Sequence, residues 1–528
     1  MKLICLDSYR QKSRIKAINN VMYCSLDLLT NYQLKKTKSN YIDLLDLDCV
    51  NFWGDISNQE LECFEYFAGF VSQYNFVKSH DFMLFSVTYC RAAQIAEELL
   101  SKYKIDEFIY FSYGDIVLHR TGPAPFEKAS CRLTSYLIAD ILERNGVKII
   151  QKKCLRVNIK KLVKSIISFR LNLPLTKVRE TDVVVLADLL YSSEIEVVKS
   201  LLNNVKVMTF KREALWRTRG TKFRASLRSR QLKFAFLGSR TERAFLGLIR
   251  SLIEEEETAQ QLFERLKTAS TLVLGHDGFA LESKLSKLMY DVNKEIISFS
   301  HYGIGYRQSF RYNNNSFSKK VLWNEDMKSY INTSAGTFPT NTIYGTNRYK
   351  IRAAMRSHDM LVNREIQILI MTSSPNLGLF DFSIKPRFII ENFGDMIFEF
   401  KKYNWTVKVR NHPSYDYHEF YRMYSGELGF TLDGGNTLQN SLDSADYCVL
   451  FASPSSVLIE AVLADVVVLL LLPDHCLRDP SDINIDLKFF PLFRNSNELA
   501  LFIENMEYHS YHKLLLAQRE EVLNFVGD

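Results

Sequence analysis

The sequence predicts an α/β protein made of doubly wound parallel sheets. Its 528 residues are enough for two or three domains, at roughly 150 residues per domain. A composition of 47% hydrophobic and 24% charged residues is ordinary for a globular protein and excludes a disordered or fibrous chain. After about residue 105, short apolar or β-branched runs alternate with amphipathic segments, which is typical of βα units in a parallel sheet.

A first series of alternating elements precedes residue 301. Residues 1–105 are rich in aromatic side chains and contain a helical pattern over Phe82–Lys104, but they do not predict a topology. Gly146 is a suitable residue to end the expected helix Phe126–Asn145. The expected strands are Phe108–Ser112, Val147–Ile150, Asp182–Ala187, Val205–Phe210, Thr271–Leu274 and Ile296–Ser300, and the expected helices are Phe126–Asn145, Glu194–Leu202, Ala244–Lys267 and Phe279–Val292.

A second series begins at residue 366, after a polar passage rich in Thr, Asn and Arg at residues 335–360. Its expected strands are Ile366–Thr372, Thr406–Val409, Tyr447–Phe451 and Val466–Leu471, and its expected helices are Pro386–Tyr403 and Ser455–Ala464. We therefore expect two doubly wound domains, residues 1–345 and 346–528, that face one another across a cleft holding the site. The alternative is two independent α/β domains without a shared site.

Positive charge is concentrated in one segment of the chain. The net charge is +7, but Lys211–Lys233 contains nine basic residues and one acid, so this segment alone carries +8. Such a segment attracts an anionic membrane surface, nucleic acid or a phosphate-bearing substrate. The alternative is a solvated loop without a partner.

Cysteine usage and hydropathy indicate a cytoplasmic protein with peripheral membrane contact. The nine cysteines form no CxxC motif, and their number is odd, as in reduced cytosolic proteins. The N-terminal apolar run is short and closely followed by charges, so no signal peptide is visible. The apolar stretch Val457–Leu472 contains Glu460 and Asp465 and is too short to span a bilayer.

Two expected strand ends in the second series carry phosphate-binding chemistry. His412 and Pro413 follow the strand Thr406–Val409, and a cluster of hydroxyls follows the strand Tyr447–Phe451, comprising Ser453, Ser455 and Ser456. Serine hydroxyls and free N–H groups at the start of a helix form a phosphate site, and we expect His412 to join them from a neighbouring strand end. Glu460, one turn along that helix, would reach a ribose diol. The alternatives are simple N-capping by the serines and a hydrogen-bonded core histidine.

This combination resembles the nucleotide-binding half of GT-B glycosyltransferases that build bacterial surface carbohydrates. It is similar to the CMP-sialic-acid and CMP-Kdo transferases and to the related CDP-glycerol and CDP-ribitol polymer transferases. The resemblance covers Ile366–Leu472 and continues loosely over Ser300–Tyr349, where Tyr302 separates His301 from Gly303 and the usual acid is missing. It implies two Rossmann-like domains, with His412, Pro413, Ser453, Ser455, Ser456 and Glu460 binding a nucleotide-sugar donor.

Sugar transfer with inversion also requires a base that removes a proton from the acceptor hydroxyl. The resembling families carry an acid-acid-Gly motif in a loop of the first domain, and Asp277 and Gly278 match its second and third positions. His276 replaces the first acid, so either Asp277 is the base, or His276 is the base and Asp277 orients it. A structural tight turn is the alternative for this segment, and Asp115 is a second candidate base.

The resemblance implies transfer of a sugar, an acidic one from a CMP donor, to a capsule, lipopolysaccharide or other lipid-linked glycan. We expect no cofactor and no metal, because CMP leaves with a single phosphate that His412 and the helix N-terminus can neutralise. Lys211–Lys233 would hold the enzyme on an anionic membrane, and no nucleic acid is expected. The alternatives are a CDP-polyol phosphotransferase of the same fold, a GT-B-like sugar-nucleotide epimerase, a catalytically silent GT-B-like module of a membrane-associated assembly, and a nucleic-acid-binding protein.

Overall fold

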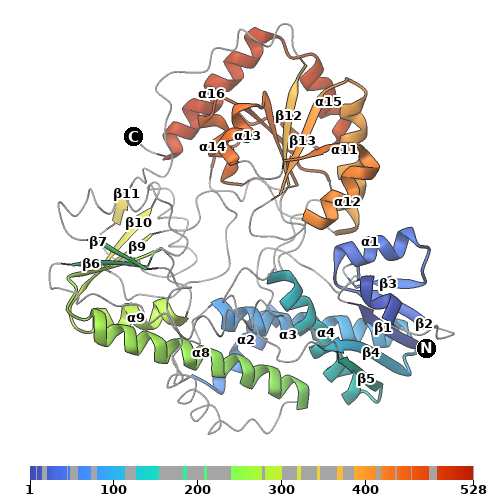
Figure 1. Cartoon of the computed structure of the whole chain (residues 1–528), viewed down its shortest axis with the longest axis vertical. Helices are drawn as coiled ribbons and strands as arrows, with labels where there is room; N and C mark the ends of the chain where they lie inside the picture. Colours follow the sequence, from blue (N-terminus) through green and yellow to red (C-terminus); the bar gives the residue numbers. More distant parts are fainter. Residues whose placement is uncertain are drawn as a thin grey trace.

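Three parallel sheets, with helices packed between and around them, make up the fold (Figure 1). The computed structural model describes residues 1–6, 9–14, 21–44, 46–47, 58–72, 80–112, 126–153, 182–186, 207–210, 239–275, 280–299, 318–322, 342–344, 365–372, 386–411, 418–433, 437–452, 455–474 and 485–526. Within these ranges every paired strand runs parallel to its neighbour. The expected α/β class with Rossmann-like parallel sheets is therefore confirmed.

The first sheet has the order β3-β2-β1-β4-β5. Strand β1 lies in the middle, and the order in which strands are added reverses there. Its strands are β1 (Lys2–Leu6), β2 (Val21–Ser25), β3 (Tyr41–Asp43), β4 (Glu107–Ser112) and β5 (Lys148–Lys153). The helical elements of this part are the 3-10 helix η1 (Tyr9–Arg14), α1 (Leu28–Lys36), α2 (Asn58–Gly69), α3 (His80–Lys102) and α4 (Phe126–Arg144).

The second sheet has the order β11-β10-β9-β8-β6-β7, which places the first strand between the second and the third. This is the flavodoxin-like order, with its reversal between β6 and β8. Its strands are β6 (Val183–Leu186), β7 (Val207–Phe210), β8 (Thr271–Leu274), β9 (Glu295–Phe299), β10 (Lys319–Leu322) and β11 (Thr342–Tyr344), and its helices are α8 (Ser239–Leu266) and α9 (Ala280–Tyr290).

Helix α8 joins the first two sheets. Its N-terminal half packs on the helices of the first sheet, where the Phe245 ring lies 4.9 Å from that of Phe67 in α2. Its C-terminal half, through Leu262 and Leu266, packs with the apolar face of the second sheet. Figure 1 shows α8 extending between α2 and the second sheet. The two halves of α8 therefore pack in two separate apolar clusters, one with each sheet.

The third sheet has the order β14-β13-β12-β15-β16-β17, the Rossmann order 3-2-1-4-5-6. Its strands are β12 (Gln367–Thr372), β13 (Thr406–Arg410), β14 (Thr431–Leu432), β15 (Tyr447–Phe451), β16 (Val467–Leu471) and β17 (Leu492–Phe493). Its helices are α11 (Pro386–Lys401), α12 (His418–Leu428), α13 (Leu438–Asp443), α14 (Val457–Leu463), α15 (Ser496–Glu504) and α16 (Tyr508–Val526).

Both faces of the third sheet are buried. Ile370 and Val449 point into the core shared with α11, α12 and α15, whereas Leu369 and Cys448 point into a second core with α14 and α16. A strand buried on both faces reads as an unbroken apolar run, which explains why the sequence predicted β15 with its observed limits. This part of the chain is the doubly wound unit that the sequence predicted.

The expected elements that fall in the described ranges are present with small shifts at their ends. The expected helix Glu194–Leu202 lies outside those ranges. Residues 1–153, whose first 105 residues had no predicted topology, form a sheet of their own, so the region before residue 345 contains two sheets. The division into domains at residue 345 stays a prediction.

The first and third sheets meet through α1 and α12, which lie side by side in Figure 1. The Tyr32 hydroxyl and the Lys36 ammonium, both on α1, donate to the two carboxylate oxygens of Glu427 on α12. The Tyr32 ring packs edge-on against Tyr424, with 5.5 Å between the ring centroids. The contact brings the N-terminal part of the chain against the third sheet's helices.

Candidate functional site

The strand order of the third sheet defines where a ligand would bind. In open α/β sheets, ligands bind beyond the carboxyl ends of the strands, at the point where the strand order reverses. Here the reversal occurs at β12, which has β13 on one side and β15 on the other. The carboxyl ends of these three strands therefore form the candidate site.

The two strand ends that carry the predicted phosphate-binding residues are not direct neighbours. Met371 of β12 pairs with Arg410 of β13 on one side and with Leu450 of β15 on the other. At about 4.8 Å per strand spacing, the ends of β13 and β15 lie about 10 Å apart. The expectation of neighbouring strand ends was wrong, because the first strand of a Rossmann sheet inserts between the second and the fourth. The end of β12 therefore lies between the two predicted groups.

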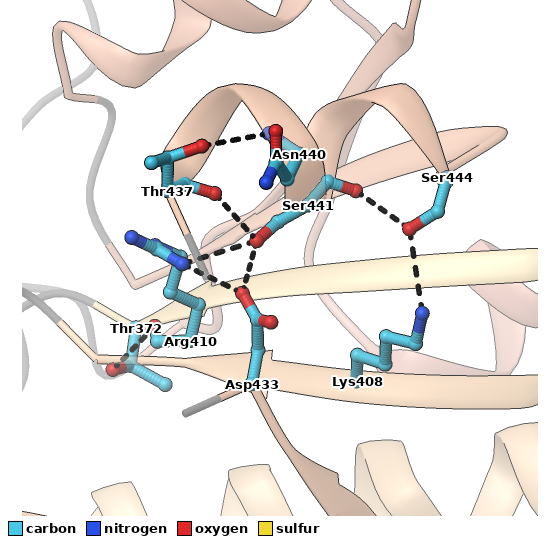
Figure 2. A network of polar contacts seen from close by, with 8 residues as sticks. All are labelled: Thr372, Lys408, Arg410, Asp433, Thr437, Asn440, Ser441 and Ser444. Atoms are coloured by element: carbon cyan, nitrogen blue, oxygen red, sulfur yellow. Dashed lines mark hydrogen bonds and ion pairs between the residues drawn. The ribbon is translucent and has the colours of Figure 1, made fainter. Parts of the chain in front are cut away.

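A polar network fixes the end of β13 (Figure 2). The Arg410 guanidinium donates to the Asp433 carboxylate at 2.8 Å and to the Ser441 hydroxyl at 3.0 Å. The Ser441 hydroxyl in turn donates to Asp433, whose side chain is only 2% exposed. Two residues earlier on β13, the Lys408 ammonium donates to the Ser444 hydroxyl at 3.3 Å. These contacts with Asp433 and with α13 and its C-cap hold the carboxyl end of β13 in one position, two residues before His412.

Asn411 and Thr372 are candidate site residues that the sequence interpretation missed. The Thr372 hydroxyl, at the end of β12, lies 3.3 Å from Asn411 Oδ1 and 3.4 Å from the Arg410 carbonyl oxygen. Asn411 Nδ2 is buried and has no hydrogen-bond partner among the residues that the structure describes. The Rossmann order was the available signal, because it puts the end of the first strand beside the residue following the second. Together these groups offer a hydrogen-bond donor at the reversal point.

The turn after β15 has an unusual backbone. Ala452 is buried and has a φ of +65°, in the left-handed region that costs an alanine about 1 kcal/mol or more. Its N–H donates to the Leu471 carbonyl oxygen at 2.8 Å, which ties the turn to β16. Residues held in this region cluster at ligand sites when the surrounding fold enforces them. The strained residue lies directly before the predicted hydroxyl cluster.

Ser455 and Ser456 are half-buried and precede α14 at this turn. Ser456 is the N-cap residue, but its side chain makes no capping hydrogen bond. The N-capping alternative therefore does not explain Ser456. Glu460 lies in the first turn of α14 and is half-buried. The pKa of the Cys448 thiol is raised mainly by the burial of that thiol and further by the nearby Glu460 carboxylate. The contact of Glu460 with a ribose stays a prediction.

The second sheet has its own reversal point, at the carboxyl ends of β6 and β8. Buried β8 ends at Leu274, and Gly275 follows it. His276 and Asp277 are the next two residues in the chain, so the candidate base follows a strand at a reversal point.

Several predicted residues lie outside the described ranges. They are His276, Asp277, His412, Pro413, Ser453, Asp115 and the basic segment Lys211–Lys233. Within the described ranges, no helix is both long and apolar enough to span a membrane. In that same part of the chain, no three His, Cys, Asp or Glu side chains are grouped so that they could hold a metal ion.

No family model matches the sequence, and no curated protein matches it. Among solved structures, the chain is similar to TarM of S. aureus, with 16% identity over 52% of this chain and 55% of TarM and a TM-score of 0.34. It is also similar to the wall teichoic acid polymerase TagF (12% identity, 70% and 93% coverage, TM-score 0.33) and to the glycosyltransferase SnogD from Streptomyces nogalater (10% identity, 65% and 95% coverage, TM-score 0.37). The match spans about half the length of TarM.

Proposed function

We propose that the chain is an inverting glycosyltransferase of the GT-B type. It would bind a nucleotide-sugar donor at the carboxyl edge of the third sheet and transfer the sugar to a glycan acceptor of a bacterial surface carbohydrate. The observation that carries this proposal is the reversal of strand order at β12, with Asn411 beyond one neighbouring strand and Ser455 and Ser456 beyond the other. The sequence resemblance through His412 and the serines points to the same edge.

The donor's phosphate would lie over the end of β12. His412, one residue beyond Asn411, would supply positive charge or a hydrogen bond, and the serine hydroxyls would donate from the opposite side. CMP is the donor nucleotide that fits this set best, because its single phosphate needs fewer counter-charges than a diphosphate. The arrangement of Arg410 in an ion pair with Asp433 supports the same choice, since that guanidinium already has an anionic partner.

The chemical step would require a base from the second sheet. Asp277, or His276 oriented by Asp277, would remove the proton from an acceptor hydroxyl while its oxygen attacks the anomeric carbon. The bond between that carbon and the phosphate oxygen would break on the opposite face, and CMP would leave with the electron pair. Attack opposite to the leaving group inverts the configuration at the anomeric carbon.

Two other functions share parts of this site. A CDP-polyol phosphotransferase would use the same histidine and serines but direct the acceptor hydroxyl at phosphorus, so its product would contain a phosphodiester. A silent GT-B-like module would keep the fold without turnover, which the replacement of the first acid by His276 favours. Identification of the product released from CMP-sugar and CDP-glycerol donors separates the three functions.

Membrane attachment through Lys211–Lys233 is part of the proposal. Each basic residue close to an anionic leaflet contributes about 1 kcal/mol. Salt-sensitive sedimentation with phosphatidylglycerol vesicles, but not with phosphatidylcholine vesicles or RNA, is the expected result. Binding to RNA alone would contradict it.

The proposal is tested by thermal denaturation with CMP, CDP, UDP and GDP. We expect CMP to raise the melting temperature, and His412→Ala to abolish that shift. Asp277→Asn should keep the shift and lose turnover. If no nucleotide stabilises the protein, the donor site is wrong, and if Asp277→Asn stays fully active, the base is wrong.

A further inference from the structure

The carboxyl edge of the first sheet contains a second cluster of polar side chains, separate from the donor site. Strand order reverses at β1 here as well, between β2 and β4. Ser25, at the end of β2, is fully buried; its hydroxyl donates to the Leu6 carbonyl oxygen at 2.6 Å and accepts from the Asp27 N–H at 3.0 Å. Ser25 thereby links the ends of β1 and β2 to the start of α1.

Asn31 is the central residue of this cluster. It is 2% exposed, and its Nδ2 donates to the Ser25 carbonyl oxygen at 3.2 Å and to the Asp43 carboxylate at 2.6 Å. Both partners only accept hydrogen bonds, so the orientation of the amide is fixed. Asn31 Oδ1 is left buried with no hydrogen-bond donor in the described part of the chain. A buried acceptor without a donor costs about 1–3 kcal/mol.

The charges around Asn31 decide which kind of donor would fit. Asp27 caps α1 and accepts from the Thr30 N–H at 2.9 Å and from the Thr30 hydroxyl at 2.5 Å. The carboxylates of Asp43 and Asp46, after burial, raise the pKa of Tyr41. The negative charge of these carboxylates therefore disfavours an anion at this edge. Neutral hydroxyl groups can donate both to Asn31 Oδ1 and to carboxylates.

The cluster around Asn31 lies close to the contact between α1 and α12 of the third sheet. Tyr32 follows Asn31 directly on α1 and contacts Glu427 and Tyr424 of α12. Tyr32 is five residues from Asp27, which is about 8 Å along a helix. A ligand at Asn31 would therefore lie beside the contact between the first sheet and the donor-binding part of the chain.

From the fixed amide, its buried and unpaired acceptor in the described part of the chain, and the surrounding carboxylates, we propose that the carboxyl edge of the first sheet binds the hydroxyl groups of a carbohydrate. The ligand would be a remote sugar unit of a long glycan acceptor, held apart from the unit that reacts near Asp277. This role as an acceptor subsite rests on the proposed glycosyltransferase function. It would give the first sheet a task that neither of the other two sheets performs.

Hydrogen exchange of the wild-type protein with methyl β-galactoside, methyl β-glucoside and methyl N-acetyl-β-glucosaminide tests the site without any mutation. We expect at least one sugar to protect peptides covering residues 23–34, while peptides around Asn145, near the opposite edge of the same sheet, stay unchanged. Absence of protection with all three sugars would overturn the proposal and make Asn31 a site for a buried water. Protection of this region by Ca²⁺ or Mg²⁺ and not by a sugar would overturn it too.

A variant pair then assigns the binding to Asn31. Asn31→Ala should weaken binding of the protecting sugar at least about tenfold, as measured by saturation-transfer NMR, whereas Asn145→Ala should leave it unchanged. CMP-induced stabilisation should persist in both variants, which also shows that Asn31→Ala is folded. Equal sugar binding by Asn31→Ala would contradict the assignment. Sugar binding at Asn31 in a protein that binds no nucleotide would instead remove the glycosyltransferase function and the acceptor role with it.

Discussion

Asn411 is the residue whose single change best distinguishes phosphate binding from general nucleotide binding. Its Nδ2 is buried beside the end of β12 and has no hydrogen-bond partner within the described ranges. Asn411→Asp replaces that donor with a carboxylate, which would repel a phosphate at close range by an amount equivalent to at least about tenfold in affinity. We expect the dissociation constant of CMP to rise at least about tenfold and that of cytidine, which has no phosphate, to stay the same.

The matched control is Asn440→Asp, which adds the same charge at an exposed position of the nearby helix α13. Isothermal titration with CMP and cytidine measures both variants. A loss of affinity shared equally by the two ligands would mean that Asn411 acts on the fold of the site and not on the phosphate.

Among the elements, the end of α4 tests whether Gly146 is required for its left-handed backbone conformation, as the sequence predicted for a glycine that ends a helix. Gly146 has a φ of +84°, and the N–H groups of Gly146 and Val147 donate to the carbonyl oxygens of Glu143 and Leu142, as in a Schellman motif. A Cβ at Gly146 would meet no atom within 4 Å. Gly146→Ala should therefore destabilise the protein by about 1 kcal/mol through the backbone alone.

Gly69, the last residue of α2, provides the comparison. A Cβ there also meets nothing within 4 Å, and its φ is not positive. Gly69→Ala should be neutral or slightly stabilising in guanidinium denaturation, because alanine favours a helix. If both variants lost the same stability, the left-handed conformation of Gly146 would not be the cause.

Strands β12, β15 and β16 of the third sheet could be predicted because they are buried on both faces and read as apolar runs, whereas the two-residue strands β14 and β17 give no such signal. In the first sheet, β4 and β5 were predicted, but β1, β2 and β3 were not, since three to five residues are too few for a clear period in a region without other signals. The candidate site was predicted in part. Ser455 and Ser456 follow a recognisable strand, whereas Thr372 is 39 residues from its contact with Asn411, and only the spatial order of the strands brings them together.

At the scale of the whole molecule, Asp140 joins the first sheet to α8. Its side chain is 2% exposed and accepts from Arg144, from the Thr241 hydroxyl at 2.7 Å and from the Arg240 N–H at 3.0 Å. Burial alone would raise the pKa of Asp140, but these hydrogen bonds lower it further than burial raises it. Asp140→Asn should cost about 2 kcal/mol at neutral pH, because it weakens the hydrogen bonds that a buried carboxylate accepts, while the half-exposed Arg144 remains solvated.

The pH dependence follows from the depressed pKa. A carboxylate with a lowered folded-state pKa stabilises the fold fully above its ordinary pKa and loses that contribution as the pH falls through the folded value. The difference between wild type and Asp140→Asn should therefore be constant from pH 7 to about pH 5 and shrink below about pH 4. Glu264→Gln, which removes an exposed pair with Lys267, should cost less than about 1 kcal/mol at every pH. A difference that does not change below pH 4 would contradict the role given to the Asp140 charge.

The arrangement of three sheets leaves one claim on which the function depends, namely that a nucleotide phosphate binds over the end of β12. Hydrogen exchange of the wild-type protein with and without CMP measures this most directly. We expect protection in peptides covering residues 406–417 and 447–458, and no such protection in His412→Ala. Protection confined to the carboxyl edges of the first or second sheet, or none anywhere, would contradict it.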